Sequence, residues 1–146
     1  MTDWNNKEEV LEAVKDFGLN LDKASKEVQA DKDVVLAAVK NDGYALKYAS
    51  DELKGDPDFI LAAVQKNGRA LKQASEEFKG NKDIVLAAVN NDSRALDYAS
   101  KELQADKEVV MAAVKQDKYV LGYGLQNADE SLKNDPEFMK EVEQYL

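Results

Sequence analysis

The sequence predicts an all-α protein, an α-α solenoid of about five and a half repeats in which two helices alternate every 25 residues. The first observation is the stretch Asp31–Val39, DKDVVLAAV, which returns with small changes at residues 56–64, 81–89 and 106–114. The second is a run of apolar residues at helical spacing after each copy. A period of this length is typical of proteins in which each unit packs only on its neighbours.

The first helix of each repeat is predicted to begin just after an Asp or Asn. Such a residue accepts hydrogen bonds from free N–H groups of the first turn, and an acidic residue two positions later complements the helix dipole. Pro57 and Pro136 follow two of these residues, where the helix tolerates proline. Gly18, Gly43 and Gly68 are expected to end the helices in a left-handed conformation. The predicted capping residues are Asp31, Asp56, Asn81, Asp106 and Asp135.

The second helix is predicted to be short or broken, as a 3-10 turn followed by one α turn. In Ala45–Leu53 the apolar residues share one helical face, but Ser50 and the acidic residues after it form a new N-cap signal. Asp129 takes the place of this serine in the fifth repeat, where four extra residues, 124–127, are expected to form a bulged loop. The equivalent serines are Ser25, Ser75 and Ser100.

We expect a single solenoid domain over residues 1–146, in the form of a complete, capped array. In the last copy Lys140 and Glu143 stand where Leu36 and Val39 stand in the second repeat. Because a terminal repeat is polar only where it has no neighbour, Leu36 and Val39 are expected to face the following repeat. The predicted repeats are 6–30, 31–55, 56–80, 81–105 and 106–134, followed by a C-terminal capping helix at 135–146.

The composition argues against several functions. The chain contains no cysteine and no histidine, which removes the commonest metal ligands and the commonest general base. Its net charge of −9 argues against nucleic acid or an anionic membrane as the partner and favours a basic protein or peptide. We expect no cofactor, no metal and no enzymatic activity. Without a signal peptide or a membrane-spanning run, a cytoplasmic monomer is the expected state.

Two motifs that resemble functional sites are interpreted as helix caps. The pair Asp31 and Asp33 could open a calcium loop, but Leu36 and Asp42 stand where such a loop needs glycine and glutamate. The repeated serines beside acidic residues could suggest hydrolase chemistry. A serine nucleophile needs a base, however, and identical copies in four repeats do not describe one active site.

Two columns of residues vary while the rest of the repeat stays constant, one near the start of the second helix and one about a turn later. Tyrosine occurs in both columns and arginine in the first, and both residue types are enriched at protein-recognition hot spots. The alternative is that the tyrosine rings only cover neighbouring repeats. The candidate partner-binding residues are Tyr44, Tyr48, Arg69, Gln73, Arg94, Tyr98, Tyr119 and Tyr123.

These observations predict a non-catalytic helical-repeat scaffold that binds a protein or peptide along one face. The alternative is a structural spacer or a self-associating module of a larger protein. The pattern D-x-[DE]-x-[VI]-[LM]-A-A-V-x-x-[DN]-G-x-A-L-x-Y-A-S-x-E-L, as in Asp31–Leu53, resembles the bacterial and protist repeat known only as domain-of-unknown-function family 4116. This resemblance implies no activity. The layout is also similar to leucine-rich variant repeats, in which an α-helix alternates with a short 3-10 helix in a curved solenoid.

Overall fold

The computed structural model of the protein describes residues 1–117 and 123–146, except for the side chain of Tyr123. All secondary structure in these two ranges is helical, which confirms the predicted all-α class. Each repeat opens with a long α-helix. The long helices are α1 (Lys7–Asp16), α2 (Lys32–Asn41), α4 (Pro57–Lys66), α6 (Lys82–Asn91), α8 (Lys107–Gln116) and α11 (Pro136–Val142), the last followed by the 3-10 turn η6 (Glu143–Tyr145).

An Asp or Asn side chain caps the start of the long helices, as predicted. In α2 the Oδ1 atom of Asp31 accepts hydrogen bonds from the backbone N–H groups of Asp33 and Val34, at 3.0 and 3.2 Å. These bonds satisfy N–H groups that have no partner inside the helix. The same role is taken in the other long helices by Asn6, Asp56, Asn81, Asp106 and Asp135.

The second helix of the repeat is divided, as predicted, into a 3-10 helix and one short helical turn. The Oγ atom of Ser50 accepts a hydrogen bond from the N–H of Leu53 at 3.3 Å, so the serine begins the second part. The 3-10 helices are η1 (Gly18–Lys23), η3 (Gly43–Tyr48), η4 (Gly68–Gln73) and η5 (Ser93–Tyr98). The short turns are η2 (Val28–Ala30), α3 (Asp51–Lys54), α5 (Glu76–Lys79), α7 (Lys101–Gln104) and α10 (Glu130–Lys133).

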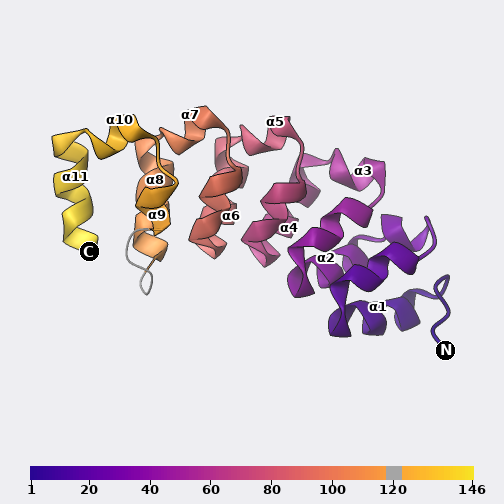
Figure 1. Cartoon of the computed structure of the whole chain (residues 1–146). Helices are drawn as coiled ribbons and strands as arrows, with labels where there is room; N and C mark the ends of the chain where they lie inside the picture. The colour runs from indigo at the N-terminus through magenta and orange to yellow at the C-terminus, as the bar shows by residue number, and fades with distance from the viewer. Residues whose placement is uncertain (118–122) are drawn as a thin grey trace.

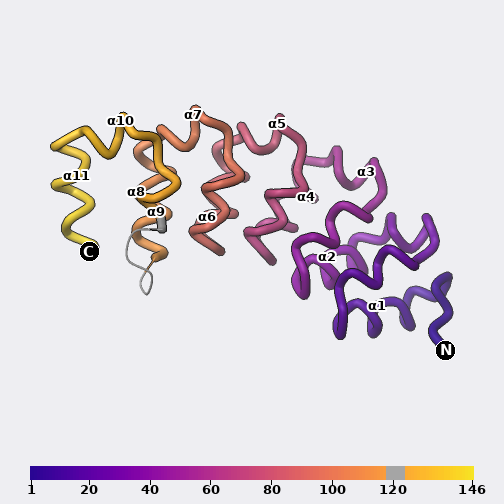
Figure 2. The backbone as a smooth tube through the Cα atoms, in the orientation of Figure 1, coloured from indigo at the N-terminus to yellow at the C-terminus, as the bar shows by residue number. Residues whose placement is uncertain are grey.

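The repeats stack so that like elements lie next to one another. The long helices form one row, which curves toward the N-terminus, and the two termini lie at opposite ends of it (Figure 1). The 3-10 helices stack in a second row, in which η3 contacts η4 and η4 contacts η5. The short helices α3, α5, α7 and α10 run along one edge, and the tube in Figure 2 follows this path as a single curved solenoid.

The apolar core lies between the two rows, and burial differs between the internal repeats and the last copy. Val39 is fully buried, while Lys140 and Glu143, which replace the Leu36-type and Val39-type residues in the last copy, are exposed. Leu61, the equivalent of Leu36 in the third repeat, is half-buried and lines a groove between α4 and α6. The leucine therefore does face the following repeat, at the edge of the contact.

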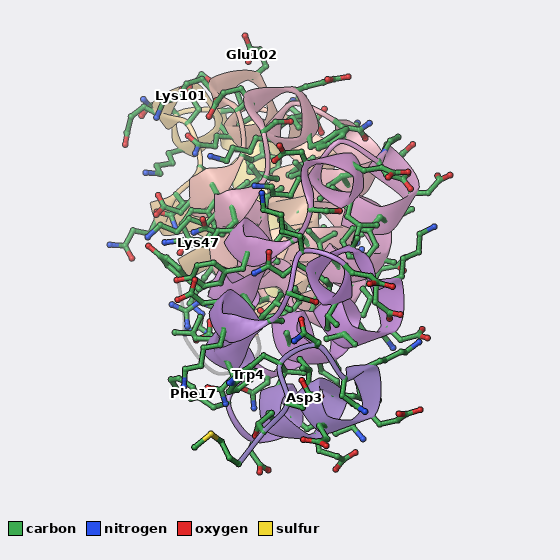
Figure 3. The ribbon with its side chains drawn as sticks, turned by 90° about the vertical axis from the view of Figure 1, so that its right-hand side faces the viewer. Asp3, Trp4, Phe17, Lys47, Lys101 and Glu102 are labelled. Atoms are coloured by element: carbon green, nitrogen blue, oxygen red, sulfur yellow. The ribbon has the colours of Figure 1, made fainter. Side chains whose placement is uncertain are left out.

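The first described residues continue the stacking pattern at the N-terminal side. The Trp4 side chain packs against the core, and its carbonyl accepts a hydrogen bond from the N–H of Ser25 at 3.0 Å. The carbonyl of Gln29 accepts the equivalent bond from Ser50, at 2.9 Å. Figure 3 looks at the molecule from this side, with Asp3 and Trp4 beside the start of α1. Trp4 thus supplies to Ser25 the carbonyl that Gln29 supplies to Ser50.

The glycines after the long helices do not take the predicted left-handed conformation. Gly18, Gly43 and Gly68 begin 3-10 helices, and none has a φ in the left-handed region. A Cβ atom on Gly68 would lie 2.3 Å from the carbonyl oxygen of Ala88, in the next repeat. One on Gly18 would lie 2.4 Å from the oxygen of Ala38. Glycine is needed here because the backbone of the next repeat passes too close for any side chain.

The fifth repeat differs from the predicted bulged loop at residues 124–127. Most of that stretch belongs to α9 (Tyr123–Gln126), an α turn that packs on α8 and η5. The N–H of Gly124 donates a hydrogen bond to Oδ2 of Asp117 at 3.0 Å, and a Cβ on Gly124 would lie 2.8 Å from the backbone of Ala113. The expectation of a bulged loop is therefore wrong for residues 124–126, which form part of a helical turn in contact with α8.

Asparagine side chains connect the backbones of neighbouring repeats. Oδ1 of Asn91 accepts a hydrogen bond from the N–H of Gly68 at 2.6 Å, and its Nδ2 donates to the carbonyl of Gln65 at 3.2 Å. Asn41 makes the same pair of bonds to the first repeat, at 2.7 and 2.9 Å. Each amide therefore satisfies one carbonyl in the last turn of the preceding long helix and the N–H of the glycine that begins the following 3-10 helix.

Lysine–aspartate ion pairs connect the starts of successive long helices. Nζ of Lys82 lies 3.0 Å from Oδ2 of Asp106 and 2.7 Å from Oε2 of Glu108. Burial acts to raise the pKa of Asp106, but the hydrogen bonds from Lys82 and from backbone N–H groups outweigh it and hold that pKa below its usual value. Equivalent pairs, at 2.9 Å each, join Lys7 to Asp31 and Lys107 to Asp135.

We expect Lys82→Gln to destabilise the fold at neutral pH and not in acid. The pKa of Asp106 is lowered from 3.8, so its pairing stabilises the fold above that pH and is lost as the pH falls through the folded pKa. The raised pKa of Lys82 adds stability below 10.5 that disappears at higher pH. Urea unfolding should show the difference between the two proteins at about pH 7 and none at about pH 2.

Lys32→Gln is the matched control for this prediction. Lys32 holds the same position in the second repeat, and it forms no ion pair with any residue in the described ranges. Its replacement should leave the unfolding free energy nearly unchanged at both pH values. Equal losses for the two variants at neutral pH would show that the ion pairs do not contribute to the stacking.

Candidate partner-binding site

The turn between the long helix and the 3-10 helix places the first column of candidate residues. Oδ1 of Asp42 accepts a hydrogen bond from the N–H of Tyr44 at 2.9 Å. Oδ1 of Asn67 accepts the equivalent bond from Arg69 at 3.1 Å. Asp42 and Asn67 have an extended backbone, and their side chains cap the start of the 3-10 helices η3 and η4. Tyr44 and Arg69 therefore occupy the same place in successive repeats, on a rigid support.

The two predicted columns differ in exposure. Side chains of the first column are exposed, namely Tyr44, Arg69 and Arg94. Those of the second column are half-buried, namely Tyr48, Gln73 and Tyr98. The rings of Tyr48 and Tyr98 pack against the core, so packing explains part of their presence, as the alternative interpretation holds. Tyr119 lies outside the described residues, and the side chain of Tyr123, at the start of α9, does too.

A pocket of about 420 Å³ brings together residues from the second, third and fourth repeats. Its volume lies within the range of about 300–1,000 Å³ that is usual for ligand sites. Three of the predicted residues line it: Tyr44 from η3, Arg69 from η4 and Tyr98 from η5. We call it the Tyr44–Tyr98 pocket. Its other lining residues are Asn41, Asp42, Gly43, Asn67 and Lys72.

Lys72 is the lining residue that the sequence analysis missed. Its Nζ atom lies 5.5 Å from the centre of the Tyr44 ring and 5.8 Å from the centre of the Tyr98 ring. Both distances are within the range in which an aromatic ring attracts a cation. Lys72 thus reaches one tyrosine in the preceding repeat and another in the following repeat. In the sequence, Lys72 follows Leu71 just as Lys47 follows Leu46, and nothing there indicates that Lys72 lies between two tyrosines.

The charges around the pocket are distributed unevenly. Asp92 accepts hydrogen bonds from Nε and Nη2 of Arg94, at 2.9 and 2.8 Å. Burial acts to raise the pKa of Asp92, but the bonds from Arg94 and the charge of Arg69 hold it below its usual value. The carboxylate is therefore committed to Arg94. The Arg69 guanidinium itself forms no ion pair with a residue whose position the structure describes.

A larger hollow of about 680 Å³ lies on the other row, between α6, α8 and α11. Leu86, Met111 and Phe138 are among its lining residues. Two of its four charged side chains have ion-pair partners, because Lys107 pairs with Asp135 and Glu108 with Lys82. Although this hollow is larger, the Tyr44–Tyr98 pocket is the stronger candidate, since three of the predicted residues line it and neither of its cations has a carboxylate partner within ion-pair distance among the described residues.

The groups that line the Tyr44–Tyr98 pocket are two phenols, two amides, a guanidinium, an ammonium and the carboxylate of Asp42. Oδ1 of that carboxylate already accepts the N–H of Tyr44. Such a set can hold a ligand by charge, hydrogen bonds and contact with the rings. Elsewhere in the described ranges, no three acidic side chains come together in a way that could bind a metal ion.

Comparison with known proteins gives one match. The model of a family described as a domain of unknown function (DUF4116) matches the chain at residues 6–54, 31–79, 56–104, 81–124 and 106–142. These overlapping matches together cover nearly the whole chain. No curated protein and no solved structure matches it. Among the helices of residues 1–117 and 123–146, none has the length and apolar character needed to cross a membrane.

Proposed function

Because this chain belongs to the family described as a domain of unknown function (DUF4116), whose description carries no activity, we propose its function from its own surface. The protein is a non-catalytic helical-repeat scaffold that binds a protein or peptide partner along the row of 3-10 helices. The observation that carries this proposal is the Tyr44–Tyr98 pocket, to which three successive repeats each contribute an aromatic or cationic side chain.

The stacked architecture supports binding of an extended partner. Each repeat presents the same positions at the same spacing, so a chain lying across the 3-10 helices meets equivalent side chains in succession. Tyrosine and arginine are the residues most often found at the centre of recognition surfaces. The N–H groups of Tyr44 and Arg69 donate hydrogen bonds to the side-chain oxygens of Asp42 and Asn67, which holds this backbone in place before a partner arrives. This order lowers the entropy lost on binding.

Charge affects the approach of the partner and its contact with the pocket differently. The net charge of −9 attracts a basic protein at long range, as the sequence analysis predicts. Salt screens that attraction beyond about 8 Å at physiological ionic strength. At contact distance the local cations, Arg69 and Lys72, therefore decide which groups enter the pocket.

The test is selection of peptides followed by a loss-of-binding measurement. We expect a random peptide library, panned on the immobilised protein, to give peptides that the triple variant Tyr44→Ala, Arg69→Ala, Lys72→Ala binds at least about tenfold more weakly. Fluorescence anisotropy measures the affinities. Because the three side chains are exposed, the melting temperature should change by only a few degrees at most.

The control replaces three exposed residues on the short-helix edge, in the variant Lys26→Ala, Glu52→Ala, Lys101→Ala. This variant should bind the selected peptides as the wild type does. The proposal fails if no peptide is selected, or if the control loses as much affinity as the pocket variant. A large drop in melting temperature for the pocket variant would assign its side chains to packing instead.

The alternative function is a structural spacer or a self-associating module. It is supported by the half-buried apolar residues on the other row, among them Leu36, Leu61 and Leu86, through which copies could associate. Light scattering over a range of protein concentrations separates the two functions. A mass that rises with concentration, together with an empty peptide selection, would favour self-association. A constant monomer mass with selected peptides supports the scaffold.

A further inference from the structure

The Tyr44–Tyr98 pocket has the opposite charge to the chain as a whole. Two cations, Arg69 and Lys72, and one carboxylate, Asp42, line it, in a protein whose net charge is −9. The charge of Arg69 also acts on the carboxylate of Asp92, but both oxygens of that carboxylate accept hydrogen bonds from Arg94. The side chains that line the pocket therefore carry one more positive charge than negative charge.

The pocket also has more hydrogen-bond donors than acceptors. A guanidinium and an ammonium only donate, while a phenol can do either. The acceptor oxygen of Asn67 already binds the N–H of Arg69, and that of Asn41 binds the N–H of Gly18. A ligand that fills the pocket must therefore bring acceptors. A carboxylate, with two oxygens and a negative charge, supplies them.

The aromatic faces of the pocket already have a cation. The ammonium of Lys72 lies over both rings, at 5.5 and 5.8 Å from their centres. A lysine or arginine from a partner would have to displace Lys72 and would meet the charge of Arg69. An incoming carboxylate meets neither obstacle, because Lys72 is held between the rings with its charge available to a neighbouring anion.

We infer that the Tyr44–Tyr98 pocket binds a carboxylate side chain of an extended acidic peptide segment in the partner. The inference rests on the proposed scaffold function and names the chemistry that its site recognises. Arg69 donates to the carboxylate oxygens and Lys72 supplies the second positive charge. Tyr44 and Tyr98 hold Lys72 and cover the flanks of the bound side chain.

The test uses three labelled peptides, hexaglutamate, hexaglutamine and hexalysine, titrated with the whole chain in fluorescence anisotropy. Hexaglutamate should bind more tightly than hexaglutamine, although the net charge of the protein opposes it. The double variant Arg69→Glu, Lys72→Glu should bind hexaglutamate at least about tenfold more weakly, since hydrogen bonds to charged groups contribute most to such a contact. Affinity should also fall as the NaCl concentration rises.

The matched control is Lys26→Glu, Lys101→Glu, which changes the net charge by the same amount on exposed residues. Figure 3 shows Lys101 beside Glu102 at the far edge of the molecule, away from Lys47 on the 3-10 row. This control should retain hexaglutamate binding. Equal loss in both variants, or preference for hexalysine, would overturn the inference. If the library selects pocket-dependent peptides rich in lysine or arginine, the inference is wrong and the scaffold function stands; if it selects none, both fail.

Discussion

Gly68→Ala is expected to lower the unfolding free energy by about 2–3 kcal/mol and the melting temperature by roughly 5–10 °C. The new Cβ atom would lie 2.3 Å from the carbonyl oxygen of Ala88, and 3.1 Å from the carbonyl carbon of the same residue. Both are backbone atoms of the next repeat, so no side-chain rotation can relieve the contact. The two repeats must separate, which weakens the contact of α6 with η4. Thermal unfolding followed by circular dichroism measures the effect.

Gly80→Ala is the control, and we expect the opposite sign. Gly80 follows α5 with a φ of −96°, and its Cβ atom would lie 3.6 Å from the nearest atom, an ordinary contact. Alanine fits this conformation and restricts the unfolded chain, so stability should stay equal or rise by up to about 1 kcal/mol. If the two variants melt alike, close approach between repeats is not the reason for glycine at position 68.

Asn91→Ala should cost about 1–3 kcal/mol, because it removes one amide that satisfies two backbone groups. The N–H of Gly68 and the carbonyl of Gln65 would both lose their partner. Gly68 is buried, so its N–H is left without a partner inside the contact between repeats. Urea unfolding gives the stability change. Hydrogen exchange at the Gly68 amide, which should become faster, locates it.

Asn90→Ala, one residue earlier, separates this role from helix propensity. Asn90 is exposed, and alanine is the better helix former, so its replacement should leave stability within about 0.5 kcal/mol or raise it. The interpretation of Asn91 as a connection between repeats is wrong if both variants lose the same stability. It is also wrong if exchange at Gly68 does not change, since the bond to Asn91 would then not be what protects this N–H.

Features that depend on neighbouring residues in the chain could be predicted from the sequence. The caps at Asp31 and its equivalents, and the break that Ser50 makes in the second helix, are confirmed. Each follows from one side chain that accepts a hydrogen bond from an N–H group two or three residues later. The exposure of Lys140 and Glu143 could be predicted for a different reason. These polar residues stand at positions that are apolar in all the other repeats.

Features that depend on contact between repeats could not be predicted in the same way. The glycine that precedes a 3-10 helix has the same sequence context as one that ends an α-helix in the left-handed conformation. Only the distance of 2.3 Å to Ala88 shows that space, rather than backbone conformation, requires Gly68. Likewise, the extra residues in the fifth repeat form α9 because α8 lies beside them, and their own sequence does not show this.

The candidate site lies between these two cases. Tyr44, Arg69 and Tyr98 could be named because they vary at positions where the rest of the repeat is constant. Lys72 could not be named, since it meets Tyr44 and Tyr98 only through the offset between stacked 3-10 helices. The excess of positive charge in the pocket was hidden for the same reason. The net charge of the whole chain is −9, which on its own favours a basic partner.

The most direct test of the scaffold function is to map a selected peptide on the protein by amide chemical shifts. We expect the shifts to concentrate at residues 42–44, 67–72 and 92–98, which belong to three repeats and include residues that line the Tyr44–Tyr98 pocket. Shifts that concentrate instead on α4, α6 and α8 would place the partner on the row of long helices and contradict the account.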